Sequence, residues 1–167
     1  PKRIMTTECG HMYRASVLEG PYWAGYEDGQ PPVECIHYVE WVGEALRTGK
    51  LKIDPAKKIK EPVTYQDSCN YNRNGGLGDL AREIISYIAE DFREMSPCRE
   101  HNFCCGGGGG RIWAETPKEE RFSDLRVAQA MEVDAQVLAT SCPYCISNFE
   151  ESVLALGDDA PRVRDVT

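Results

Sequence analysis

Apolar and polar positions follow two different periods along the chain. Short apolar runs predict strands at residues 3–7, 63–65 and 137–140. Apolar residues spaced three or four positions apart predict helices at about residues 37–47, 80–92, 118–131 and 144–156. Because strands and helices alternate in the second half, the pattern indicates an α/β fold with a small parallel sheet and flanking helices.

Two stretches interrupt this pattern. Residues 19–32, EGPYWAGYEDGQPP, are rich in Gly, Pro and aromatic residues and predict a loop that serves as a lid or a docking surface. Residues 49–62, GKLKIDPAKKIKEP, are charged and bracketed by Pro, which predicts a connector or a short edge hairpin. The strand-like start follows Pro1 with no initiator Met, so we expect the sequence to be a fragment.

Composition and charge exclude several classes of function. The chain is 41% hydrophobic and 28% charged, with a formal net charge of −8. It lacks the clustered Lys and Arg of a general nucleic-acid surface. Its apolar runs are far shorter than the roughly 20 residues that cross a bilayer, and no stretch reads as a secretory signal. We therefore expect no nucleic-acid partner, no direct membrane insertion and a cytoplasmic location.

Eight cysteines are the most informative feature of the composition. Without a secretory signal, metal-bound thiolates in a reducing compartment are a better interpretation than a disulfide scaffold. Five of them follow the pattern C-x34-CC-x36-C-x2-C, formed by Cys69, Cys104, Cys105, Cys142 and Cys145. Each falls at a turn beside a predicted strand end or helix start, so we expect cysteine-bearing loops to gather at one edge of the sheet.

The number of cysteines in this pattern indicates which kind of metal site they form. Cys142-Pro143-Tyr144-Cys145 alone suits a thioredoxin-like redox pair, half of a zinc site or an iron–sulfur ligand pair. A structural zinc ion takes four ligands, whereas an iron–sulfur cluster is larger and accepts more thiolates. The run Gly106–Gly110 suits a bulky cluster, because residues without Cβ atoms let the backbone lie close to it. A flexible linker is the alternative for this run; a phosphate loop would need a following Gly-Lys-Ser/Thr.

The segments DSCNYNRNGG, FCCGGGGG and SCPYC together resemble the CCG domain, the cysteine-rich module of heterodisulfide reductase catalytic subunits. The resemblance covers about residues 63–156. Upstream, VECIHYVEWVGEALRTGKLKI resembles the helix segment that links two such repeats. Residues 1–62 are therefore expected to be the end of a preceding repeat plus a linker, and residues 63–167 the cysteine-rich domain. Within the family, the chain looks most like the iron–sulfur subunit of the membrane complex associated with dissimilatory sulfite reductase.

This resemblance implies a noncubane [4Fe-4S] cluster on Cys69, Cys104, Cys105, Cys142 and Cys145, with Gly106, Gly107 and Gly108 beside it. It also implies reduction of a disulfide or trisulfide carried by a small protein or thiol. The expected partners are other subunits of a membrane-bound, cytochrome b-type or quinone-linked redox complex, which would place the chain at the inner face of the membrane. Only 22 residues follow Cys145, too few to complete a glutaredoxin-like fold, so we interpret Cys142 and Cys145 as cluster ligands.

Three further residues are candidate catalytic groups. Cys9 resembles the closing cysteine of a preceding repeat, although Thr6 stands where a second cysteine would be, so a complete second cluster is not expected. Cys9 either faces the substrate or is an ordinary buried thiol. His11 is a candidate proton donor to a leaving thiolate, with a surface histidine as the alternative. His37 lies on the linking segment, where a helix-capping or core histidine is the simpler interpretation.

The remaining candidates have structural interpretations. Cys35 and Cys98 fall outside the five-cysteine pattern and are expected to be structural. His101 lies in a charged loop, with a hydrogen bond to cluster sulfur as the alternative. The aromatic residues are expected to pack in the core or in loops, with partner contact as the alternative; they are Tyr22, Trp23, Tyr26 and Trp113. Arg73 and Arg111 flank the cysteine loops, where they either offset thiolate charge or pair with surface carboxylates.

Two other functions stay open. One is an electron-transfer subunit of the glycolate or lactate oxidase type, which passes electrons without meeting a disulfide. The other is a zinc-stabilised assembly domain with no enzymatic role.

Overall fold

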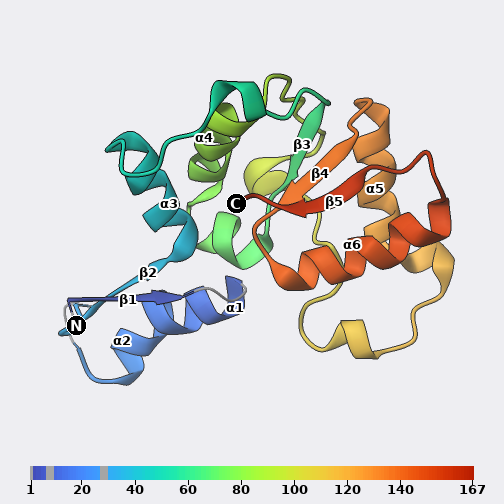
Figure 1. Cartoon of the computed structure of the whole chain (residues 1–167). Helices are drawn as coiled ribbons and strands as arrows, with labels where there is room; N and C mark the ends of the chain where they lie inside the picture. Colours follow the sequence, from blue (N-terminus) through green and yellow to red (C-terminus); the bar gives the residue numbers. More distant parts are fainter. Residues whose placement is uncertain (1, 7–9, 27–29) are drawn as a thin grey trace.

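The structure is a computed structural model that describes residues 2–6, 10–26 and 30–167 (Figure 1). Its strands form two parallel sheets. The smaller sheet pairs β1 (Arg3–Thr6) with β2 (Glu34–His37). The larger has the order β3-β4-β5, with bounds Val63–Gln66, Val137–Thr140 and Arg162–Asp165. Because all neighbours are parallel, the carboxyl ends of β3, β4 and β5 lie at one edge of this sheet.

Helices make up most of the rest of the described chain. The α-helices are α1 (Gly10–Tyr13), α2 (Gly20–Trp23), α3 (Tyr38–Arg47), α4 (Gly78–Ile88), α5 (Phe122–Glu132) and α6 (Pro143–Leu156). Two segments have π-helical geometry, η1 (Arg14–Glu19) and η3 (Asn70–Asn74). Short 3-10 turns are η2 (Pro55–Lys57), η4 (Arg99–His101), η5 (Arg111–Trp113) and η6 (Lys118–Glu120).

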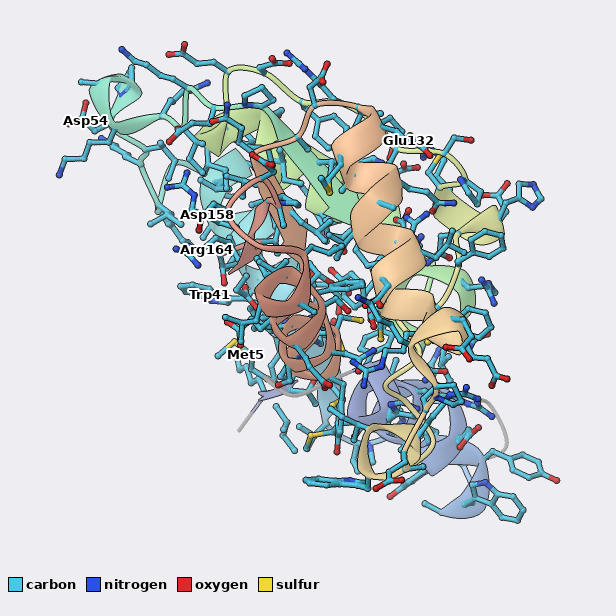
Figure 2. The ribbon with its side chains drawn as sticks, turned by 90° about the vertical axis from the view of Figure 1, so that its right-hand side faces the viewer. Met5, Trp41, Asp54, Glu132, Asp158 and Arg164 are labelled. Atoms are coloured by element: carbon cyan, nitrogen blue, oxygen red, sulfur yellow. The ribbon has the colours of Figure 1, made fainter. Side chains whose placement is uncertain are left out.

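The larger sheet has a hydrophobic core on each face. Side chains of a strand alternate between faces, so Val137 and Ala139 of β4 face one way and Leu138 the other. The first face packs against α3 and α4, and the second against α5 and α6. Figure 2 shows α5 and α6 side by side, with Glu132 at the end of α5 farthest from the N-terminal helices.

The helix α3 joins the N-terminal part of the chain to the larger sheet. It begins with a capping box, in which His37 accepts from the N–H of Val39 and Glu40 accepts from the N–H of His37. Val39 and Leu46 of α3 belong to the core that contains Tyr65 of β3. The Tyr38 hydroxyl also donates to the carboxylate of Asp165 in β5, at 3.0 Å.

The structure confirms the predicted α/β class, with small parallel sheets, flanking helices and cysteines in the loops. The loop predicted for residues 19–32 is wrong at Gly20–Trp23, which form α2. Residues 49–62 form a connector with one short turn, η2. Two strands, β2 and β5, have no counterpart among the predictions. Over the part of the chain that the structure describes, no helix is both long and apolar enough to span a bilayer.

Candidate functional site

The five cysteines of the spaced pattern come together at the carboxyl edge of the larger sheet. β3 ends at Gln66 and the chain turns through Asp67 and Ser68 to Cys69. β4 ends at Thr140, and Cys142 is the N-cap of α6, with Cys145 in its first turn. Cys104 and Cys105 arrive on the loop after η4 and line the same pocket as the other three.

The thiols contact one another in series. The thiols of Cys69 and Cys105 donate to the sulfur of Cys104, and the thiol of Cys145 interacts with the sulfurs of Cys105 and Cys142. The other lining residues of the pocket are Gly10, His11, Ser68, Asn70, Gly108 and Tyr144. Its free volume is about 20 Å³, so a bound metal centre would have to move the sulfurs apart.

These contacts divide the thiols into two kinds. Hydrogen bonds from Cys105 and Cys69 lower the pKa of Cys104 to about 2. A hydrogen bond from Cys145 lowers the pKa of Cys142 to about 6, and the backbone N–H groups of Cys145, Gly10 and Tyr144 contribute. The pKa values of the donor thiols are raised instead. That of Cys105 is raised to about 12 by its hydrogen bond to Cys104. Those of Cys69 and Cys145 are raised by their hydrogen bonds to neighbouring thiols and by burial.

The glycine run supplies backbone donors to the paired cysteines. The N–H of Gly106 donates to Cys104 Sγ at 3.3 Å, and that of Gly107 to Cys105 Sγ at 3.4 Å. Gly106 has φ +85, a conformation that favours glycine. At Gly108 a Cβ would lie 3.1 Å from the His11 ring. The backbone therefore comes this close to the thiols and to His11 because these positions lack side chains.

A buried polar network holds the loops that carry the thiols. The Asp67 carboxylate is completely buried and accepts two hydrogen bonds from Arg82, at 2.8 and 2.9 Å, and one from the N–H of Arg99. Asn102 donates to the carbonyl of Asp67 and so ties the loop before Cys104 to the loop before Cys69. Asn148 of α6 donates to the Cys105 carbonyl. Single asparagines carry no periodic or spacing signal, so sequence reasoning missed both.

Arg73 also holds the loop before Cys104 in place. Its guanidinium donates to the carbonyls of Glu100 and Asn102, and its charge contributes to the lowered pKa of Cys104. Of the two sequence interpretations of Arg73, proximity to thiolate charge is therefore the better supported. The guanidinium of Arg111 lies over the Phe122 ring, 5.9 Å from its centroid.

The three candidate catalytic residues differ in what the structure shows of them. Cys9 lies outside the described residues, although the N–H of its neighbour Gly10 reaches Cys142. His11 lines the thiol pocket, with its ring 6.3 Å from that of Tyr144. His37 does not line the pocket: it caps α3, is completely buried and packs against Tyr13, Tyr38 and Tyr71. Catalytic roles for all three stay predictions.

Cys35 and Cys98 do not line the thiol pocket, whereas Trp113 lines a neighbouring cavity together with His11, Gly108 and Tyr144 of that pocket. Cys35 accepts a hydrogen bond from the Ser16 hydroxyl in the N-terminal part, and Cys98 lies near Glu94 and Arg82. Core packing is wrong for Tyr22, Trp23 and Trp113, which are strongly exposed, Trp113 at 85%.

The donor set suits an iron–sulfur cluster. Five thiols line one pocket, two of them favour the thiolate, and backbone N–H groups point at four of the sulfurs. Within residues 2–6, 10–26 and 30–167, no group of three or more His, Cys, Asp or Glu side chains forms a ready site for a metal ion. That result agrees with thiols that contact in series instead of converging on one point.

Comparison with known proteins gives a consistent picture. The model of the cysteine-rich domain family (CCG) matches residues 63–150. The chain is 31% identical to the EtfAB:quinone oxidoreductase of Syntrophomonas wolfei and 32% identical to the probable iron-sulfur-binding oxidoreductase FadF of Bacillus subtilis, each match covering 99% of the chain. It is 30% identical, over 90% of the chain, to a subunit of the dihydromethanophenazine:CoB--CoM heterodisulfide reductase of Methanosarcina barkeri.

The chain spans only part of these relatives: 23%, 22% and 36% of their lengths, respectively. No solved structure matches it.

Proposed function

The chain belongs to the cysteine-rich domain (CCG) family, and from this membership we propose that it is the iron–sulfur module of an oxidoreductase of the heterodisulfide reductase type. Cys69, Cys104, Cys105, Cys142 and Cys145 would hold a noncubane [4Fe-4S] cluster, and Gly106, Gly107 and Gly108 would lie against it. The observation that carries the proposal is the series of five thiols in one pocket. A single zinc ion would leave at least one of the five without a metal.

The reaction we propose is the reduction of a disulfide or trisulfide. When bound, the cluster would supply electrons one at a time. Two electrons and two protons convert a disulfide into two thiols, so a proton donor is needed beside the site. His11 lines the pocket and is the described residue that we assign to this step, with its imidazole protonating the leaving thiolate. Cys9 would contact the substrate sulfur. His37 is the third candidate catalytic group, although it packs against Tyr71 and does not line the pocket.

The backbone around the pocket would keep the cluster ligands ionised. N–H groups of Gly10, Gly106 and Gly107 donate to sulfur atoms and stabilise negative charge on them. The neighbouring Asp67–Arg82 pair is buried and fixes the turn that leads to Cys69. These residues would orient the ligands and limit their movement when the redox state changes.

The partners we propose are the other subunits of a membrane-bound redox complex, of the cytochrome b or quinone-linked kind, at the cytoplasmic face. The names of the relatives support this, since one is a quinone oxidoreductase and another belongs to a dihydromethanophenazine-dependent reductase. Residues 1–62 would be the end of a preceding repeat plus a linker, and 63–167 the cysteine-rich domain. The more specific assignment is the iron–sulfur subunit of a complex associated with dissimilatory sulfite reductase.

The test is metal analysis on protein prepared without oxygen, combined with EPR spectra of the oxidised form with and without a disulfide or thiol. We expect about four irons per chain, with matching sulfide, and a paramagnetic signal that changes when the disulfide or thiol is added. One zinc and no iron after careful reconstitution would contradict the proposal and leave a structural assembly domain.

A second function is favoured by the relative named as a quinone oxidoreductase, whose name includes no disulfide. The chain would then pass electrons between partners, as in the glycolate or lactate oxidase type. The same spectra distinguish the two functions, because an electron-transfer module would hold iron but its signal would not respond to disulfide or thiol.

A further inference from the structure

Arg126 of α5 is a completely buried arginine. Its Nε donates to Gln66 Oε1 at 2.7 Å, and its Nη1 donates to the carbonyl of Pro97 at 3.0 Å and to the side chain of Gln129. Among the described residues its Nη2 has no hydrogen-bond partner, and no carboxylate lies within ion-pair distance of it. Asp67, Glu94 and Cys98 act on it electrostatically, but both carboxylates are already paired with Arg82. A buried charge without a counter-ion in contact is costly, so further negative charge nearby would stabilise it.

The contacts of Arg126 lead to the thiol pocket. Gln66, which accepts from Arg126, donates from its own Nε2 to the carbonyls of Phe103 and Asp67, at 2.9 and 3.0 Å. Phe103 directly precedes Cys104, and Asp67 lies two residues before Cys69. The next residue of α5, Val127, packs in the same core as Cys105, Cys142 and Cys145. One glutamine side chain thus separates the buried guanidinium from the loops that carry the thiols.

We propose that Arg126 is the internal counter-charge of the thiol site: its guanidinium offsets the negative charge of the thiolate-bound cluster and, through Gln66, positions the segment that leads into Cys104. This inference rests on the proposed iron–sulfur function. Solvent screens a buried charge only weakly, so its field at the site is stronger than that of an exposed arginine. A fixed positive charge stabilises an added electron, and Arg126 should therefore raise the reduction potential of the cluster.

The test compares three variants of the iron-loaded protein in a redox titration followed by EPR. Arg126→Gln removes the charge but can still donate to Gln66. Arg126→Lys keeps the charge without the forked geometry. Arg162→Gln, the control, removes an equal charge from an exposed ion pair with Glu61.

We expect Arg126→Gln to lower the reduced-to-oxidised ratio at a fixed potential about tenfold, equivalent to about 59 mV for one electron. Arg126→Lys should restore most of this shift, and Arg162→Gln should leave the potential unchanged. A potential in Arg126→Gln equal to that of the unaltered protein would overturn the inference.

A further variant covers the case in which Arg126→Gln does not fold. Gln129→Glu leaves the arginine in place but puts a carboxylate where Nη1 now donates to an amide oxygen. Like Arg126→Gln, this variant should lower the reduction potential of the cluster, because the new carboxylate neutralises the charge of Arg126. An unchanged reduction potential would again overturn the inference.

Stability provides a readout that does not depend on the potential. The cluster would add negative charge that the guanidinium can offset, so iron loading should raise the melting temperature less in Arg126→Gln than in the unaltered protein. An equal rise in both proteins would mean that Arg126 has only a structural role. If the unaltered protein holds no iron at all, the proposed function itself fails; iron at full occupancy with an unchanged variant refutes only the role of Arg126.

Discussion

Cys104 accepts hydrogen bonds from two of the other four thiols. It accepts hydrogen bonds from Cys69, Cys105 and the N–H of Gly106, and its pKa is lowered by these donors. A sulfur that three groups already stabilise as a thiolate is ready to bind metal, although the sulfurs must move apart to admit a metal centre. Cys98 differs, since burial raises the pKa of its thiol and no other cysteine is among the groups that shift it.

Replacing Cys104 should therefore remove the metal site. We expect Cys104→Ser to lose most of the iron after anaerobic reconstitution, because the hydroxyl is a poor substitute for a central thiolate ligand. Cys98→Ser is the matched control and should bind as much iron as the unaltered chain. Colorimetric iron and sulfide assays give the comparison, and equal iron loss in the two variants would contradict the assigned ligand set.

The assignment of His11 as a proton donor can be checked in the same way. His11→Asn should lower the rate of disulfide reduction about 10²- to 10⁴-fold, the usual contribution of a general acid, while iron content stays the same. His101 is an exposed histidine on a neighbouring loop, with 82% of its side chain accessible, so His101→Asn serves as the control. Similar rates for His11→Asn and the unaltered protein would assign the proton to another donor.

The residues of the site differ in how far the sequence predicted them. Cysteine spacing and the CCG resemblance predicted that five cysteines gather in the loops at one sheet edge, and they do. The supporting residues Asn102, Gln66 and Arg126 escaped notice because polar side chains are ordinarily read as exposed. Their burial depends on contacts between segments that lie from 29 to 60 residues apart, which no local pattern carries.

At the scale of elements, prediction succeeded where a segment has its own apolar pattern. The strand predicted at 137–140 is β4, and the helix predicted at 144–156 is α6 with one more residue. β5 was missed because Arg162, Arg164 and Asp165 surround a single buried Val163, the pattern of an exposed edge strand. The helix predicted at 118–131 begins instead at Phe122, after the separate turn η6.

The turn after Cys69 is held by close packing against the N-terminal helices. At Gly75 a Cβ would lie 2.5 Å from the Tyr71 carbonyl oxygen and 2.7 Å from the Tyr13 ring. We expect Gly75→Ala to lower the free energy of unfolding by about 1–3 kcal/mol, since backbone and ring must both shift. Urea denaturation measures this change.

Gly49→Ala is the control for that substitution. Gly49 has φ +69, and no atom lies within 4 Å of the place where its methyl group would be, so this variant reports backbone strain alone, about 1 kcal/mol. A loss at Gly75 well below about 1 kcal/mol would mean that steric contact with Tyr71 and Tyr13 is unimportant.

At the scale of the whole molecule, the N-terminal part and the cysteine-rich part are physically joined. Val39 and Leu46 share a core with Val63 and Tyr65, and Tyr38 is hydrogen-bonded to Asp165 near the other end of the chain. The N–H of Gly10, in the N-terminal part, donates to the sulfur of Cys142. The site is therefore built from segments spread over the sequence, and anything that ties these segments together stabilises the complete fold.

Iron binding should have this effect, because one cluster would connect the loop after β3, the Cys104–Cys105 loop and the start of α6. A ligand present at about 100 times its dissociation constant contributes about 2.7 kcal/mol of stability. For a domain of this size that corresponds to a rise in melting temperature of about 5–10 °C. Removing iron anaerobically with a chelator should reverse the rise, as followed by circular dichroism under reducing conditions. Cys104→Ser should show no such shift, and a melting temperature independent of iron would mean that the five thiols do not share a cluster.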